Sequence, residues 1–99
     1  MADFTKKSAE IFPVSVDFEK VLDTGETLIL GSSTVLVEDS DGNDVTSAMI
    51  VPGSESVSGS QYMAKVRAGT DDESYKISFQ VTTSDSNVYE KDLNFKVKD

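Results

Sequence analysis

Residues 70–83, TDDESYKISFQVTT, contain a run from Tyr75 to Val81 in which apolar and polar side chains alternate with a period of two. The apolar members occupy every second position: Tyr75, Ile77, Phe79 and Val81. This pattern predicts a central β-strand with one face in a hydrophobic core and the other in water. Asp71 stands four residues before Tyr75, a spacing typical of a tyrosine corner, in which the hydroxyl of a Tyr near the start of an immunoglobulin-type strand bonds backbone a few residues upstream. We therefore predict a structural tyrosine corner at Asp71 and Tyr75.

Length and residue types limit the chemistry that is open to this chain. Its 99 residues fit one domain. The sequence contains no Cys and no His, which excludes disulfides, thiolate metal sites and every Ser-His or Cys-His mechanism. We accordingly predict a protein that is not an enzyme and that has no catalytic residue, no cofactor and no bound metal.

The charge balance is strongly acidic. Asp and Glu number 18 against 9 Lys and Arg, which gives a formal net charge of −9. Such a balance repels phosphate backbones and anionic lipid headgroups, so we expect neither a nucleic-acid nor a membrane partner. The N-terminal sequence MADFTKKSAE lacks the apolar stretch of a signal peptide, which favours synthesis in a cytoplasm without export.

Six further stretches carry strand patterns. They are residues 11–18, 26–30, 34–38, 45–51, 61–68 and 89–97. Pro13 restricts the first of them to an edge or a bulge, and Gly31 to Ser33 interrupt the chain between the second and the third. No segment shows the apolar stripe of a substantial helix. The sequence predicts an all-β, seven-stranded immunoglobulin-like sandwich over residues 11–99, preceded by a flexible N-terminal arm at residues 1–10.

Two polar connections inside the predicted domain contain many turn-forming residues. Residues 39–44, DSDGND, place oxygen-bearing side chains at alternate positions, which superficially resembles a calcium loop. The Gly and the bidentate Glu that such a loop needs are absent from the matching positions, so we interpret the segment as a hairpin turn whose side chains bond local backbone. Residues 52–60, PGSESVSGS, are expected to form a long, exposed and mobile loop.

A second acidic run, Asp71 to Glu73, raises the question of a carboxylate acid and base pair. Adjacent residues in a short loop have no cleft around them to desolvate one carboxyl group and shift its pKa. We therefore interpret Asp71 as part of the turn before Tyr75.

Two long segments resemble small bacteriophage and prophage virion proteins of immunoglobulin-like fold. They are VSVDFEKVLDTGETLILGSSTVLV (residues 14–37) and YKISFQVTTSDSNVYEKDLNFKV (residues 75–97). The features that match are an acidic, aromatic first strand, a Gly-Glu-Thr loop end, a Ser-Ser-Thr strand entry, a Tyr-led strand ending in Thr-Thr-Ser, and an alternating last strand. Phe18 and Val35 stand where such proteins often carry Trp, and residues 39–60 do not match. The resemblance implies a structural role in a phage particle without enzymatic activity.

Two functions remain open at this point. The first is a virion structural or accessory protein, complete as a small gene product, that binds a head, connector or tail protein. It would use exposed strands 11–18 and 89–97, loop 52–60 or the N-terminal arm, and would be monomeric or weakly associated when isolated. The alternative is an immunoglobulin-like module of a bacterial surface or secreted protein that recognises carbohydrate or a host protein.

Overall fold

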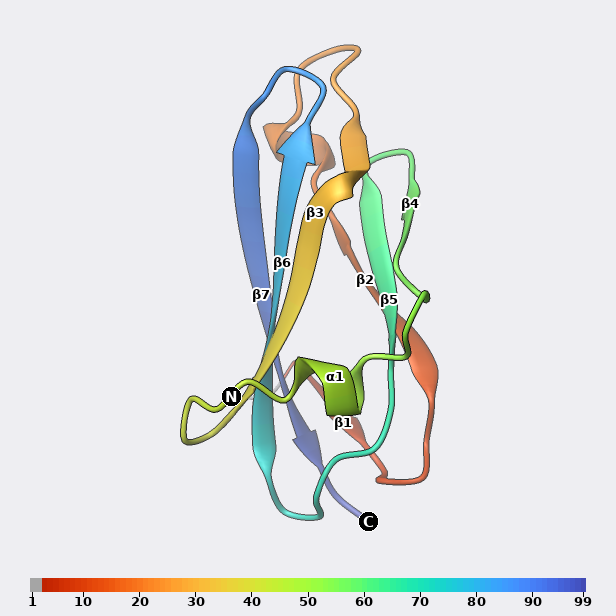
Figure 1. The fold of residues 1–99 in the computed structure, drawn as a ribbon, viewed down its shortest axis with the longest axis vertical. Coiled ribbons are helices and arrows are strands. Elements are labelled where there is room, and N and C mark those ends of the chain that lie inside the picture. The colour runs from red at the N-terminus through yellow and green to blue at the C-terminus, as the bar shows by residue number, and fades with distance from the viewer. Residues whose placement is uncertain (1–2) are drawn as a thin grey trace.

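The computed structural model describes residues 3–99 and contains two facing β-sheets (Figure 1). The strands are β1 (Phe4–Lys6), β2 (Phe12–Asp17), β3 (Leu28–Asp39), β4 (Ser56–Ser58), β5 (Gln61–Val66), β6 (Ser74–Thr83) and β7 (Val88–Val97). One sheet has the order β1-β7-β6-β3 and the other the order β2-β5-β4. Two helical turns, η1 (Glu19–Val21) and α1 (Thr46–Met49), complete the elements, and in residues 3–99 no helix is long and apolar enough to cross a membrane.

The strand order is that of an immunoglobulin sandwich, which confirms the predicted fold class. Strands β7, β6 and β3 correspond to the G, F and C strands of that fold, and β2, β5 and β4 to B, E and D. Strand β1 joins the first sheet by pairing in parallel with β7. The segment expected as the first strand, within residues 11–18, therefore takes the place of the second immunoglobulin strand.

Strand β6 lies in the middle of its sheet, as the alternating pattern predicts. It pairs in antiparallel register with both β3 and β7. Ile77, Phe79 and Val81 on β6 are fully buried and face the opposite sheet. There Phe79 meets Tyr62 of β5 in an edge-to-face contact with ring centroids 5.6 Å apart. Large apolar side chains from both sheets thus fill the space between them.

The two strands expected at residues 26–30 and 34–38 form the single strand β3. Its register against β6 shifts between Ile29 and Thr34, so the predicted interruption is a β-bulge within a continuous strand. Ser33 Oγ donates to the carbonyl of Ile29 (2.7 Å) and accepts from the amide of Thr82 (3.2 Å). This hydroxyl replaces ladder hydrogen bonds, which is why the strand continues through Gly31 to Ser33.

The prediction of a strand at residues 45–51 is also wrong. Thr46–Met49 form the single helical turn α1, and Ile50 then makes one antiparallel bridge to Val66. Asp44 Oδ1 accepts hydrogen bonds from both the amide (2.9 Å) and the hydroxyl (2.7 Å) of Thr46, a local arrangement that favours a turn over extended backbone. Loop 52–60 is likewise shorter than expected, because β4 (Ser56–Ser58) pairs with β5.

The predicted N-terminal arm needs correction at Phe4–Lys6, which form strand β1. Phe4 stacks on Phe95 with ring centroids 4.8 Å apart and an interplanar angle of 5°. Lys6 is 1% exposed, and its ammonium donates to the carbonyls of Lys7 (2.8 Å), Ser8 (3.2 Å) and Ala68 (2.6 Å). Aromatic packing and a satisfied buried cation hold this strand in the sheet. Residues 1 and 2 of the expected arm lie outside the described residues.

Candidate functional site

Tyr75 lies at the start of β6 and contacts the turn that precedes the strand. Its ring is 7% exposed and stacks on Phe95 with centroids 5.4 Å apart. The amide of Thr70 donates a hydrogen bond to the Tyr75 hydroxyl over 2.9 Å. The contact ties the β5–β6 connection to the sheet, and its contribution to stability as a tyrosine corner stays a prediction.

Asp71 is not bonded to Tyr75. Its Oδ1 atom accepts from the amide of Asp99 at the C-terminal end of the chain (2.9 Å). The neighbouring Asp72 forms an ion pair of 2.6 Å with Lys98, and this contact lowers the pKa of Asp72 and raises that of Lys98. The acidic run therefore fastens the end of β7 to the β5–β6 connection, and the two residues of the predicted corner contact different parts of the chain.

The Asp39–Asp44 segment reverses the chain. The amide of Gly42 donates to the Asp39 carbonyl (3.0 Å), and the backbones of Glu38 and Asp44 form an isolated antiparallel β-bridge. Asp39 Oδ1 accepts from the amides of Asp41 and Asn43, both over 2.9 Å, while Asn43 Nδ2 donates to Oδ2 (3.2 Å). These hydrogen bonds, those from Asn43 foremost, lower the pKa of Asp39. Its carboxylate is thus directed at local backbone, as expected for a turn of this kind.

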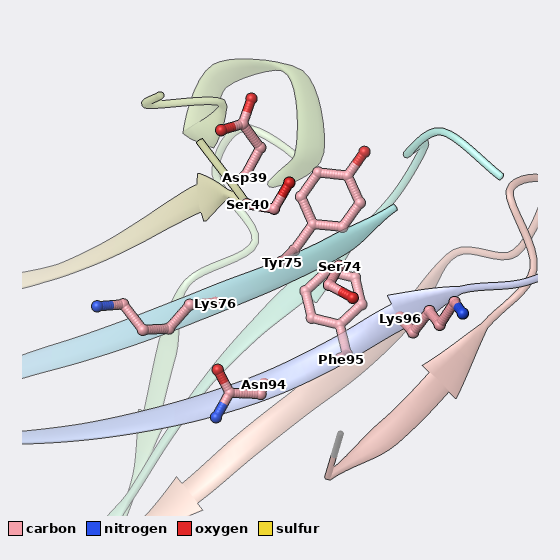
Figure 2. A pocket seen from close by; sticks show the side chains of 8 residues that line it. All are labelled: Asp39, Ser40, Ser74, Tyr75, Lys76, Asn94, Phe95 and Lys96. Carbon is pink, nitrogen blue, oxygen red and sulfur yellow. The ribbon is translucent and has the colours of Figure 1, made fainter. Parts of the chain in front are cut away.

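A shallow hollow lies beside this turn, over the start of β6 and the end of β7 (Figure 2). Asp39, Tyr75, Lys76 and Lys96 are among its lining residues. Lys76 already pairs with Glu38 over 3.6 Å, and the carboxylate of Asp39 is occupied by the turn. Charges of both signs line this hollow without converging on one point, so we assign no binding or catalytic role to it.

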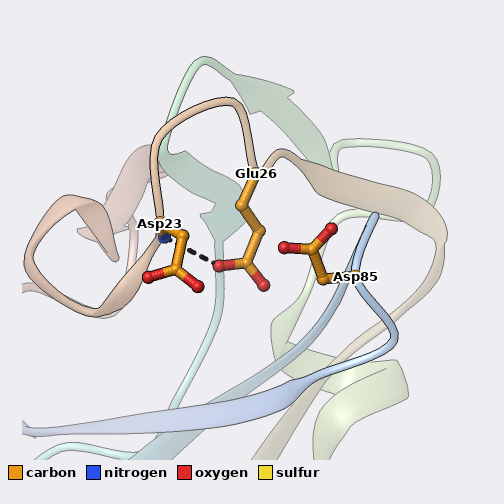
Figure 3. A group of neighbouring side chains, drawn as sticks. All are labelled: Asp23, Glu26 and Asp85. Carbon is orange, nitrogen blue, oxygen red and sulfur yellow. Dashed lines mark hydrogen bonds between the residues drawn. The ribbon is translucent and has the colours of Figure 1, made fainter.

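Three carboxylates meet at the opposite end of the sandwich, where Asp23, Glu26 and Asp85 have oxygens within 4.8 Å of one another (Figure 3). Glu26 is 7% exposed and accepts hydrogen bonds from the Thr83 hydroxyl, the amide of Asp23 (2.9 Å) and Asn87 Nδ2 (3.0 Å). These donors, with Thr83 foremost, lower the pKa of Glu26. The arrangement joins the β2–β3 loop to the β6–β7 turn, which gives Glu26 a structural role.

Strand β3, at the edge of its sheet, carries several exposed apolar side chains. Val35 and Val37 pair with the core residues Phe79 and Ile77, so Leu36 between them faces outward. Ile29, Leu30 and Leu36 are 40%, 43% and 38% exposed. We call these three residues the β3 edge surface. From Leu28 to Val37 the strand contains neither a charged residue nor Pro.

Other sheet edges are protected by the usual devices against unwanted pairing. Strand β2 carries Pro13, β1 and β4 have three residues each, and β7 beyond β1 has the charged run Glu90 to Asp92. At the end of β3, the Val37 amide donates a hydrogen bond to the Thr46 hydroxyl, and the Val37 carbonyl accepts one from the Val45 amide. The open part of β3 therefore runs from residue 28 to residue 36, protected only by its bulge.

Sequence reasoning missed this surface and selected 11–18 and 89–97 as the exposed strands. Whether a strand lies at an edge depends on the order of strands in the sheet, which is a long-range property. One local signal was present, because Leu28 to Val37 form an uncharged run in a chain of which 27% is charged.

The chain was compared with models of known protein families. The family model described as "Podophage GP4 fiber-tail adaptor protein gp77" matches residues 6–96, whereas no curated protein matches. The match confirms the resemblance to phage virion proteins and supports that interpretation over a bacterial surface module. The family consists of structural proteins of phage tails and is not an enzyme class. The chain therefore belongs to the podophage fiber-tail adaptor family typified by gp77.

Proposed function

We propose that this protein is a non-enzymatic adaptor of the phage particle that docks on a tail or fiber protein through the β3 edge surface. The family description supplies the class of partner. The observation that carries the proposal is the open part of β3. It is an uncharged strand at the edge of its sheet, and Ile29, Leu30 and Leu36 are exposed along it.

The physical argument rests on what such an edge does in water. An edge strand without charge or Pro is a template for pairing with another chain, and exposed apolar side chains beside it gain free energy when they are covered. An extended segment of the partner that lies along β3 satisfies both needs, since backbone pairing supplies affinity and alternate side chains supply specificity. The partner segment is therefore expected to be extended and mainly apolar.

The remaining features of the proposal follow from charge and surface. A net charge of −9 favours a basic protein surface as partner and disfavours nucleic acid and anionic membranes. It also opposes self-association, so the isolated chain is expected to be monomeric or weakly associated. Synthesis in the bacterial cytoplasm followed by incorporation into the virion completes the proposal.

The experiment compares charged substitutions on two exposed apolar sites. Ile29→Lys and Leu36→Lys place an ammonium group on the β3 edge surface, and Ile11→Lys makes the same change at a residue that is 61% exposed before β2. Each variant is mixed with the purified tail and fiber proteins of the same phage, and complexes are measured by analytical ultracentrifugation. We expect the parent and Ile11→Lys to bind one of these proteins, and the two β3 variants to lose binding.

The fold of each variant is checked by its melting temperature before binding is compared. Equal binding by all variants would refute the β3 edge surface as the docking site. The adaptor function would be refuted if the parent bound none of the tail and fiber proteins and mass spectrometry did not detect it in purified particles.

A further inference from the structure

A cleft of about 490 Å³ opens beside β3, between that strand and the segment that leads into β4. Leu30 and Val35 contribute apolar wall, and Glu55 and Tyr62 contribute polar groups. The volume lies within the range of small ligand sites. Because Leu30 belongs both to this cleft and to the β3 edge surface, the cleft continues the proposed docking surface into the space between the two sheets.

Tyr62 reaches this cleft from the centre of the β2-β5-β4 sheet. The residue is 1% exposed, and it stands between Val16 and Val57 in the strand register. No hydrogen bond of the Tyr62 hydroxyl is found within residues 3–99, and no fully buried polar side-chain atom there lacks a partner, so this hydroxyl is open to the cleft. Burial, followed by the nearby Glu55 carboxylate, raises the pKa of Tyr62, so the hydroxyl stays protonated at neutral pH. A ligand in the cleft can therefore form a hydrogen bond with this hydroxyl, which both donates and accepts.

Glu55 adds a carboxylate to the same cleft. The preceding Ser54 fixes the segment, because its amide donates to the Val51 carbonyl (3.1 Å) and its Oγ accepts from the Lys65 amide (3.0 Å). The ion pairs found within residues 3–99 join other residues, Lys76 with Glu38 and Lys98 with Asp72. Since neither ion pair includes Glu55, this half-buried carboxylate presents an unpaired negative charge next to the Tyr62 hydroxyl.

We propose that this cleft receives one Lys or Arg side chain from the protein that docks on the β3 edge surface, an inference that rests on the function proposed above. Leu30 and Val35 pack against the aliphatic stem of the incoming side chain. Its charged end donates to the Glu55 carboxylate and to the Tyr62 hydroxyl oxygen, which gives a charge-assisted hydrogen bond. The docking segment thus carries one cation within an otherwise apolar stretch.

The first test uses a defined probe and does not depend on the virion partner. The probe is the blocked pentapeptide TVKVT, whose β-branched residues favour an extended chain, and its control is the same peptide with norleucine in place of lysine. Binding to the full, isotope-labelled chain is followed by NMR. We expect saturable shifts of the amides of Leu30, Glu55 and Tyr62, with affinity about tenfold or more lower for the norleucine peptide, as for a lost charge-assisted hydrogen bond.

Variants then assign the effect to the two polar groups. Glu55→Gln and Tyr62→Phe are each expected to weaken the lysine peptide, while Glu90→Gln, which removes the same charge from an exposed site on β7, leaves binding unchanged. The ring of Phe fills the same space in the core as the ring of Tyr62, so Tyr62→Phe keeps the fold. Unchanged chemical shifts of residues away from the cleft verify this. Equal affinity for the two peptides, binding by Glu55→Gln at parental strength, or the absence of saturable shifts at the cleft would overturn the inference.

A second measurement separates this inference from the proposed function. In the complex with the tail or fiber protein, loss of binding by Leu36→Lys together with full binding by Glu55→Gln would leave the adaptor function in place and refute the cation site. Loss of binding by both, with Glu90→Gln unaffected, supports the two proposals together.

Discussion

Lys91 of β7 lies over the ring of Phe18, with its ammonium nitrogen 5.4 Å from the ring centroid, and it also donates to the backbone carbonyl of Asp17. In the strand register Lys91 pairs with Phe79, so it stands in the inward phase of an otherwise apolar row. The long aliphatic stem covers the core while the ammonium group reaches the rim. A charged residue in the wrong phase is thereby accommodated without an unsatisfied cation.

Replacement of Lys91 tests this arrangement. Lys91→Gln keeps much of the stem and removes the charge, and we expect it to lower the free energy of unfolding by about 0.5–1 kcal/mol, the usual contribution of an exposed cation–π contact. Lys20→Gln, in the neighbouring turn η1, is the matched control. Urea unfolding curves measure both, and equal midpoints would contradict a stabilising contact between Lys91 and Phe18.

The hydrogen bond between Thr70 and Tyr75 is expected to stabilise the fold. Tyr75→Phe removes only the hydroxyl oxygen that accepts from the Thr70 amide, so we expect a loss of about 0.5–1.5 kcal/mol in the free energy of unfolding. Tyr89→Phe is the control, because Tyr89 is half-buried on β7 and makes no hydrogen bond through its hydroxyl within residues 3–99. If Tyr75→Phe were as stable as the parent protein, the tyrosine-corner assignment would be wrong.

We expect the Asp39–Asp44 turn not to bind calcium tightly. The Asp39 oxygens already accept from the amides of Asp41 and Asn43, and the segment lacks a bidentate twelfth ligand. Isothermal titration of the parent protein with CaCl₂ should give no saturable heat in the micromolar range. Micromolar saturation that Asp41→Ala abolishes would contradict this prediction.

Stability is expected to fall in acid, with Glu26 as one contributor. Hydrogen bonds from Thr83, Asp23 and Asn87 lower the pKa of Glu26 in the folded state. A depressed carboxyl pKa contributes stability that is present at neutral pH and is lost as the pH falls from about 4.3, the unfolded value, through the folded pKa. Glu26→Gln should therefore reduce stability at pH 7 more than at pH 3. Thermal unfolding at both values, with Glu90→Gln as control, measures the difference.

The sequence predicted those elements whose pattern is local. Strand β6 and the β6–β7 hairpin show regular alternation, and both are present. Strand β1 was not predicted because it has only three residues and buries Lys6. The Lys6 ammonium is satisfied by distant backbone such as the Ala68 carbonyl. Residues 45–51 were misassigned because the Asp44 carboxylate bonds Thr46, and this local bond outweighs the apolar content of the segment.

The candidate site was harder to predict than the fold. The position of Tyr75 followed from its spacing, but Asp71 contacts Asp99, a residue 28 positions away in the chain. The exposure of Ile29 and Leu36 depends on β3 lying at an edge, and the approach of Glu55 to Tyr62 depends on how the two sheets face each other. Contacts of this kind are set by tertiary packing, which single-sequence patterns do not record.

The parallel pairing of β1 with β7 also determines how the protein responds to mechanical tension. The N-terminal strand enters beside Asn94, where Asp3 donates over 2.6 Å, and the C-terminal strand leaves beside Lys6, which accepts from Lys98 over 2.8 Å. Tension applied across the two chain ends acts along both strands in opposite directions. The hydrogen bonds between them, and the stacked rings of Phe4 and Phe95, are then loaded in shear together instead of opening one after another.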